Sequence, residues 1–246
     1  MPKKKIRLDL ILVEKGLARS RQRARALVMA GRVLVNNQVI DKAGALVLRD
    51  DDIALKETDH SYVSRGGLKL AKALQIFEID IDGFVCLDVG ASTGGFTDCL
   101  LQSGASRVFA VDVGYGQLAW KLRQDSRVVV IERTNIRHMP AEIISKPVDL
   151  VTIDVSFISL KIVIPAVMQF IKKDAAILAL IKPQFEVGKG KVGKGGIVRD
   201  SSQHTEVIND LSEHFLQHGL LSRSVIPSPI LGSKGNKEFF IYLKSA

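Results

Sequence analysis

Short apolar runs of strand length recur along residues 84–246, separated by segments with helical spacing. Runs of this length indicate buried strands, and apolar residues three and four apart indicate helices that cover them. We expect strands at 84–87, 107–112, 128–131, 149–154, 175–181, 220–226 and 238–243. We expect helices at 96–103, at 160–170 with a kink or break at Pro165, and at 201–218. This alternation predicts an α/β fold built on a doubly wound, seven-stranded sheet.

The first 60 residues follow a different pattern. A helix is expected from Arg7 to Lys15, and Ser20 is placed to cap a second helix at 21–30. Two short apolar runs flank the turn Asn36-Asn37, which predicts a hairpin of 33–35 and 38–40, and a third strand is expected at 52–56. We therefore expect a small α+β domain at 1–60, a linker at 61–67 containing Gly66-Gly67, and a large domain at 68–246.

Charge is concentrated in the small domain. The chain has 246 residues, 46% of them hydrophobic, and a formal charge of +9. Residues 1–32 contain ten Lys or Arg and two acids, a net +8, so the other 214 residues net only +1. This distribution predicts a polyanionic partner for the first domain.

Several classes of protein are disfavoured by composition. The longest clean apolar run, 175–181, is far too short to span a membrane, and no signal-peptide core follows the first lysines, so we expect a soluble, cytoplasmic protein. Cys86 and Cys99 fall in one strand–helix unit and are expected to be core residues, and the five histidines show no ligand spacing. We expect no metal and, by default, a monomer.

The turn after the first strand of the large domain is rich in glycine. It reads G-x-x-x-G-G, which fits neither the dinucleotide fingerprint nor a phosphate-binding loop. Asp88 before it would repel a pyrophosphate but suits a cationic ligand such as S-adenosyl-L-methionine, and Asp112 lies at the spacing of a ribose-binding carboxylate. An ordinary turn with a solvated acid is the alternative. The residues expected to bind S-adenosyl-L-methionine, the methyl donor, are Asp88, Gly90, Ser92, Thr93, Gly94, Gly95, Phe96, Asp112, Asn135 and Asp154.

Charged residues also stand at the carboxyl ends of later strands, where ligands bind in such sheets. Asp154 follows the fourth strand and Lys182 the fifth. Each has a plainer explanation, because Asp154 could cap a helix and Lys182 could extend to solvent. Lys69, at the edge of a buried helix face, and Glu238, at the start of the last strand, could likewise be only solvated.

The small domain resembles the S-four-type (S4) RNA-binding domain. The match runs from Leu12 to Val39 and includes R-S-R-x-x-A and A-G-x-V-x-V-N. The resemblance implies binding to structured RNA through phosphate contacts, whereas the alternative is a solvated basic helix face. The expected RNA-binding residues are Arg7, Arg19, Arg21, Arg23, Arg25 and Arg65.

The large domain resembles the FtsJ-like ribose 2'-O-methyltransferases, which have a Rossmann-like, seven-stranded fold and a Lys-Asp-Lys-Glu tetrad. The matching residues are Lys69 in GGLKL, Asp154 in TIDVSF, Lys182 in LIKPQFE and Glu238 in NKEFF. Nearly the whole chain resembles the TlyA family, described as hemolysins and acting as rRNA cytidine 2'-O-methyltransferases. One departure is Thr93, which stands where the wider family usually has Pro.

The resemblance implies a role for each tetrad residue. Lys182 would be the central catalytic residue, stabilising the developing alkoxide when charged or acting as base when neutral. Asp154 would hold Lys182, and Lys69 and Glu238 would orient the hydroxyl and the lysines. Base methylation is disfavoured, because Asp154 precedes Val-Ser-Phe rather than Pro-Pro and an aromatic, and neither cysteine ends a strand.

Two other functions remain open at this stage. One is an RNA-binding ribosome-assembly factor that binds the donor without turnover, and the other is a lytic activity. The short lead before Arg7 and the end of the chain just after the last strand favour a ribosomal large-subunit substrate, with the small subunit as a further possibility. The sequence does not identify the nucleotide.

Overall fold

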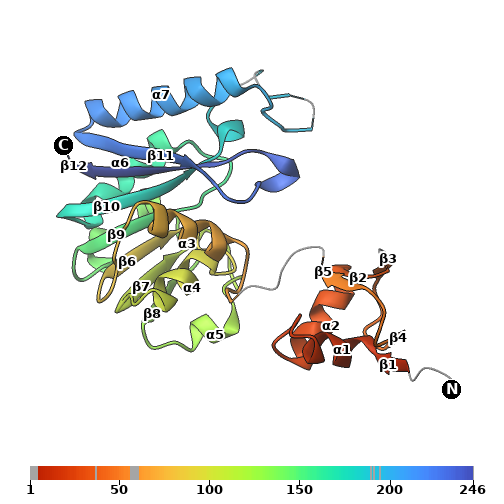
Figure 1. Cartoon of the computed structure of the whole chain (residues 1–246). Helices are drawn as coiled ribbons and strands as arrows, with labels where there is room; N and C mark the ends of the chain where they lie inside the picture. Colours follow the sequence, from red (N-terminus) through yellow and green to blue (C-terminus); the bar gives the residue numbers. More distant parts are fainter. Residues whose placement is uncertain are drawn as a thin grey trace. The chain divides into compact units, whose positions relative to one another are not determined.

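The computed structural model describes residues 5–36, 38–55, 61–188, 190, 192–193 and 195–245 (Figure 1). Within it the chain divides into two compact units, Met1–Ser61 and Tyr62–Ala246. Each unit has its own hydrophobic core, so each is described by itself.

The first unit packs two helices against short strands. Its elements are β1 (Lys5–Arg7), α1 (Leu8–Glu14), α2 (Arg21–Met29), β2 (Val33–Val35), β3 (Gln38–Ile40), β4 (Leu46–Leu48) and β5 (Ile53–Leu55). The Ser20 hydroxyl accepts the Arg23 N–H at 3.1 Å and caps α2 as expected. β3, β2 and β5 form an antiparallel sheet, while β1 pairs with β4, a pairing that the sequence did not predict. Asn37 of the expected turn and residue 56 of the expected third strand lie outside the described residues.

The second unit is built on the expected seven-stranded sheet. Its strands are β6 (Val85–Val89), β7 (Arg107–Val111), β8 (Val128–Ile131), β9 (Val148–Ile153), β10 (Ile171–Ile181), β11 (Leu220–Pro227) and β12 (Phe239–Ser245). They lie in the order β11-β12-β10-β9-β6-β7-β8. β12 runs antiparallel to both of its neighbours, and β10, β9, β6, β7 and β8 are mutually parallel. β10 starts four residues earlier than expected, beyond a register shift between Ile171 and Ala176.

Helices cover both faces of this sheet, because successive strand residues point to opposite sides. Leu87 and Val89 of β6 pack in a core with α6 (Leu160–Val167) and α7 (Ser201–Gln217). Cys86, which precedes Leu87 and points to the opposite face, packs in a second core with α3 (Gly66–Ile76), α4 (Gly95–Gln102) and α5 (Trp120–Arg123). Figure 1 shows α3 and α4 together on one face of the sheet. The observed layering is that of a Rossmann-like methyltransferase domain.

Five short 3-10 turns complete the described part of the second unit. They are η1 (Ile136–His138), η2 (Ala141–Ile143), η3 (Met168–Phe170), η4 (Pro183–Phe185) and η5 (Ser233–Gly235). Pro165 does not break its helix, since α6 continues to Val167 and then tightens into η3.

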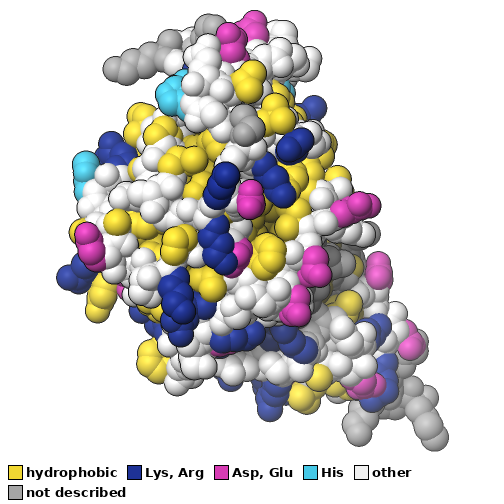
Figure 2. Space-filling model, turned by 90° about the vertical axis from the view of Figure 1, so that its left-hand side faces the viewer, with side chains coloured by type: hydrophobic (Ala, Val, Ile, Leu, Met, Phe, Trp, Pro, Cys, Tyr) yellow, Lys and Arg dark blue, Asp and Glu magenta, His cyan; other side chains and the backbone are white. Residues whose placement is uncertain are grey.

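The face drawn in Figure 2 carries basic and acidic side chains intermixed with hydrophobic ones.

Most of the segment expected to be a linker belongs instead to the second unit. α3 already starts at Gly66, and the Tyr62 ring packs so closely that a Cβ at Gly67 would overlap it. The Val63 N–H donates to Asp98 at 2.8 Å, and Lys121 binds the same carboxylate at 2.8 Å. The linker prediction for 62–67 was therefore wrong, because the two glycines serve close packing rather than freedom of the chain.

Candidate active site

Two adjoining clefts open where the parallel strands end. The lysine cleft, with a volume of about 310 Å³, is lined by Ser64, Arg65, Gly66, Lys69, Gly90, Ala91, Ser92, Thr93, Gly95, Phe96, Asp154, Ser156, Lys182, Leu231, Gly232, Ser233 and Glu238. The strand-end cleft is lined by residues that include Val89, Val111, Asp112, Gln117, Asn135, Phe157 and Ile162, and has a volume of about 860 Å³. Gly90, Ser92, Asp154 and Ser156 line both. A ligand that occupies both clefts would therefore pass the Gly-rich turn and Asp154.

The Gly-rich turn needs glycine for reasons of space. A Cβ at Gly90 would lie 2.6 Å from the Asp154 carbonyl oxygen, and one at Gly95 would overlap the Ser64 hydroxyl. Gly94 has φ +95° and its missing side chain faces Leu118 and Leu122, so it shapes the turn from behind rather than lining either cleft. The backbone on the cleft side is left open to a ligand.

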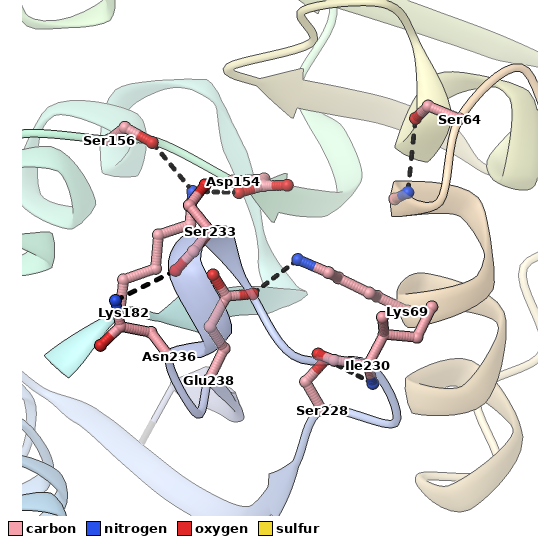
Figure 3. Close-up of polar contacts among 11 residues, drawn as sticks. Ser64, Lys69, Asp154, Ser156, Lys182, Ser228, Ile230, Ser233, Asn236 and Glu238 are labelled. Carbon is pink, nitrogen blue, oxygen red and sulfur yellow. Dashed lines mark hydrogen bonds and ion pairs between the residues drawn. The ribbon is translucent and has the colours of Figure 1, made fainter. Parts of the chain in front are cut away.

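Two ion pairs bring the four predicted tetrad residues into the lysine cleft (Figure 3). The Lys69 ammonium lies 2.5 Å from Glu238, and the Lys182 ammonium lies 2.5 Å from Asp154. The side chains are 12%, 3%, 11% and 23% exposed in that order, so the pairs are largely shielded from water. The four residues therefore form two separate pairs, each of one lysine and one carboxylate.

Four elements far apart in the sequence supply these side chains. Lys69 lies in the first turn of α3, and Asp154 and Lys182 immediately follow β9 and β10. Glu238 precedes β12, whose antiparallel direction brings its first residue to the same edge of the sheet as the ends of β9 and β10. Figure 3 shows the four side chains converging from these elements.

Asp88 does not line either cleft, in contrast to its predicted contact with the donor. It is fully buried within β6, where its carboxylate accepts the Thr97 hydroxyl at 2.6 Å and the Thr152 hydroxyl at 3.2 Å. Burial raises the pKa of this carboxyl to about 7, partly offset by the two hydroxyl hydrogen bonds. Asp88 thus joins α4 to β9 behind the Gly-rich turn, and its role is to position that turn.

Asp112 and Asn135 do line the strand-end cleft. Asp112 accepts the Ser92 N–H and the Gly114 N–H, both at 2.7 Å. Asn135 caps η1 by accepting the Arg137 N–H at 3.1 Å. Each Asp112 oxygen keeps a further lone pair for a hydroxyl donor, which is the chemistry that ribose requires.

Sequence reasoning missed two residues beside the tetrad. The Ser156 hydroxyl accepts from Lys182 at 3.1 Å, and its position two residues after Asp154 was the available signal. Phe157 is 89% exposed with φ +64°, and its ring centroid lies 4.9 Å from that of Phe185 at the strand-end cleft. An exposed aromatic ring on a residue with a left-handed backbone conformation is energetically costly. The sequence around Phe157 did not indicate this conformation.

The arginines of the first unit have two different environments. Arg7 and Arg21 both bind Asp9, at 2.9 and 3.0 Å, and the Arg7 hydrogen bond is the main cause that lowers the pKa of this carboxyl to about 2. Arg25 is exposed on α2, beside Gln22 and Met29 on one shallow surface. Arg19 donates to the Ser61 carbonyl at 3.5 Å, Arg23 is half-buried on α2, and Arg65 lines the lysine cleft of the second unit.

Other chemistries find little support among the described residues. They include no group of three or more His, Cys, Asp or Glu that could bind a metal ion. Cys86 and Cys99 are free and buried, and burial raises the pKa of both thiols, that of Cys99 to about 12. No helix in the described part of the chain is long and apolar enough to cross a membrane.

Comparison with known proteins gives consistent matches to both units. Residues 62–245 match the FtsJ-like methyltransferase family, and residues 6–53 match the S4 domain family. The chain is 47% identical to the 16S/23S rRNA (cytidine-2'-O)-methyltransferase TlyA of Mycobacterium tuberculosis, over 98% of this chain and 91% of that protein. It is 39% identical to Hemolysin A of Brachyspira hyodysenteriae, over 96% and 99%. A solved hemolysin-like structure from Streptococcus thermophilus aligns with a TM-score of 0.77 and 42% identity, over 98% of this chain and 89% of that one.

Proposed function

This chain belongs to the TlyA family of FtsJ-like methyltransferases, and we propose that it methylates the 2'-hydroxyl of a cytidine ribose in ribosomal RNA, with S-adenosylmethionine as donor. The observation that carries the proposal is the pair of shielded Lys–carboxylate contacts beside an open Gly-rich turn. The relative that is named as acting on 16S and 23S RNA supports rRNA as the substrate class. We expect the large subunit to be modified, and the small subunit is the further candidate.

The residues that line the clefts suit the chemistry of S-adenosylmethionine. Asp112 offers carboxylate lone pairs to ribose hydroxyls, and Asn135 and Ile136 line the same cleft, where we expect the adenine to bind. The open backbone at Gly90 and Gly95 leaves room for the amino-acid end in the lysine cleft. When bound, the donor supplies a methyl group on a positively charged sulfur. Asp154 lines both clefts, where its carboxylate favours that positive charge.

The two lysines act on the acceptor, the ribose 2'-hydroxyl. A ribose hydroxyl becomes nucleophilic as its proton leaves, and the Lys182 ammonium, fixed by Asp154 and Ser156, stabilises the negative charge that develops on the 2'-oxygen. Lys69, fixed by Glu238, orients the same hydroxyl. The oxygen–carbon bond forms as the carbon–sulfur bond breaks, and the proton of the hydroxyl passes to water.

The first unit supplies a second kind of contact. Its S4 family match and the basic helix α2 support binding to folded RNA through phosphates. Arg19, Arg25 and Arg65 are exposed candidates for such contacts, and Arg7 and Arg21 are candidates that also bind Asp9. We propose that this unit selects the RNA and the second unit performs the transfer.

The test is methyl transfer from labelled S-adenosylmethionine to isolated large and small ribosomal subunits that lack the modification. Wild-type protein should label RNA of the large subunit, and Lys182→Ala should lose at least about a hundredfold in rate while it keeps donor and RNA affinity. Lys172→Ala is the matched control, because Lys172 lies at the start of β10, the opposite end from Lys182, and likewise pairs with an aspartate, Asp149, at 2.5 Å.

Each other outcome points to a different function. Label on both subunits would extend the substrate to the small one. Donor and RNA binding without transfer to either subunit would favour the ribosome-assembly factor, and lysis of red cells by detergent-free protein would favour the lytic activity.

A further inference from the structure

The loop that carries Glu238 closes into a tight turn at residues 232–236. The Gly232 N–H donates to the Asn236 carbonyl at 2.8 Å, and the Asn236 N–H donates to the Ser233 carbonyl at 3.2 Å. The Asn236 side chain adds a third bond, from its amide N–H to the same Ser233 carbonyl at 3.1 Å (Figure 3). The turn is therefore fixed at Asn236 by both backbone and side chain.

Asn236 also binds a segment that is distant in the sequence. Its side-chain nitrogen donates to the Gly196 carbonyl at 2.9 Å, and its side-chain oxygen accepts the Val198 N–H at 3.0 Å. Asn236 and Val198 are each only 2% exposed. Because a buried amide that loses its partners is costly, these bonds fix Asn236 in one orientation.

The Val198 carbonyl is bound from a third element. The His204 ring on α7 lies with Nε2 at 3.0 Å from that carbonyl, which assigns the proton to Nε2. His204 is 5% exposed, and its ring centroid lies 5.5 Å from that of Phe239, the residue after Glu238. Both polar backbone groups of Val198 are thus bound, the N–H by Asn236 and the carbonyl by His204.

Glu238 rests against the other side of the same turn. A Cβ at Gly232 would overlap its carboxyl group, so this carboxylate and the turn backbone are in direct contact. Any change in the turn would therefore displace Glu238 from Lys69, which lies 2.5 Å away. Asn236 belongs to this turn and also binds the Gly196–Val198 segment, so it connects the two.

We propose that Asn236 is a positioning residue for methyl transfer, which couples the Gly196–Val198 segment to Glu238 and keeps Glu238 on Lys69. This inference rests on the proposed function and assigns Asn236 no contact with substrate. It predicts that loss of the side chain lowers turnover through Glu238, while donor affinity is kept.

Steady-state kinetics provide the first readout. Asn236→Ala should lower kcat by about tenfold, with the KM for S-adenosylmethionine changed less than about twofold. Asn236→Asp keeps an acceptor for Val198 but loses both donors, so it should also lower kcat. Ser228→Ala is the matched control in the same loop and should leave kcat unchanged, because among the described residues the Ser228 hydroxyl bonds only to Ile230 nearby. Unchanged kcat in both folded Asn236 variants would overturn the proposal.

A double-mutant cycle separates positioning from general stability. If Asn236 acts through Glu238, Asn236→Ala in a Glu238→Gln background should lower the remaining rate by less than about twofold. Equal losses in the two backgrounds would show that Asn236 acts independently of Glu238 and would overturn the coupling.

Hydrogen exchange tests the coupling without activity. The Val198 amide donates to Asn236, and the Ser228 amide donates to the Glu238 carbonyl at 2.8 Å, so the two amides report the two ends of the connection. Asn236→Ala should accelerate exchange at both by at least about fivefold. Acceleration at Val198 alone would overturn the coupling. If wild-type protein methylates no RNA, the proposed function fails, and the exchange result still decides whether Asn236 couples the two segments.

Discussion

Two aspartates in similar sequence contexts, Asp88 and Asp154, have opposite surroundings in the second unit. Both come at the end of an apolar run of strand length. Asp88 is fully buried between two threonine hydroxyls, whereas Asp154 lines both clefts and pairs with Lys182. The difference shows that an acid inside a strand near its end and an acid just beyond a strand serve separate purposes.

The cause is where each strand ends. β6 extends one residue past Asp88, so the alternation of side chains points Asp88 into the core below α4. β9 ends at Ile153, so Asp154 lies on the irregular backbone at the edge of the sheet. A buried acid shapes the turn from behind, while an edge acid is available to a lysine and to a ligand. Three substitutions test this distinction.

The largest expected effect is on Asp154. Asp154→Asn removes the charge that fixes the Lys182 ammonium and leaves it only Ser156, so kcat should fall by about 10²- to 10³-fold. Single-turnover methyl transfer at saturating donor and RNA measures this loss. A rate within about threefold of wild type would show that the Lys182–Asp154 pair is structural, and the contrast with Asp88 would disappear.

Asp88→Asn should change stability with pH rather than chemistry. The ordinary pKa of 3.8 is raised to about 7 by burial, so the folded protein keeps the proton between these values while the unfolded chain has lost it. The resulting stabilisation is complete below about pH 4 and is lost as the pH rises through 7. Relative to wild type, Asp88→Asn should gain about 2–3 kcal/mol in the free energy of unfolding between pH 5 and pH 8.

Urea unfolding of both proteins at pH 5 and pH 8 measures this difference, because other titrating groups cancel between them. Parallel pH dependence would place Asp88 in an ordinary, ionised state and would contradict the burial argument. Methyl transfer at pH 7 serves as the internal control, since Asp88→Asn should lose far less activity than Asp154→Asn.

Asp112 lies between these extremes, because it is at the edge of the sheet but already accepts two backbone N–H groups. Asp112→Asn replaces one accepting oxygen by a donor that opposes a backbone N–H, and it weakens the acceptor set for ribose. The affinity for S-adenosylmethionine should fall about tenfold, while kcat at saturating S-adenosylmethionine should change little. Calorimetric titration with S-adenosylhomocysteine measures the affinity, and an unchanged Kd would remove Asp112 from the donor site.

Much of this arrangement could be predicted from the sequence, and the reasons for the misses are specific. Apolar runs located the seven strands, and the distinct segments around Lys69, Asp154, Lys182 and Glu238 located residues that the structure brings together. The side of β6 on which Asp88 lies depends on a strand boundary one residue away, which patterns do not resolve. β1 and β4, of three residues each, are too short to show a period. Asn236 has its partners about 40 positions away, so no local pattern could reveal it.

The smallest expected effect is on RNA affinity, and it distinguishes arginines held in ion pairs from arginines that face solvent in the first unit. Arg25→Ala removes an exposed cation from α2, so affinity for large-subunit RNA should fall about fivefold at physiological salt, and the slope of log K against log salt should decrease by about 1. Arg21→Ala removes a cation whose charge is partly balanced by Asp9, so its effect on the slope should be smaller, and it should lower the stability of the unit instead. Filter binding across a salt series measures both slopes. Equal slopes for the two variants would mean that Arg21 leaves Asp9 and binds phosphate when RNA binds. The Arg21–Asp9 pair would then exist only in the free protein and would not be a structural contact.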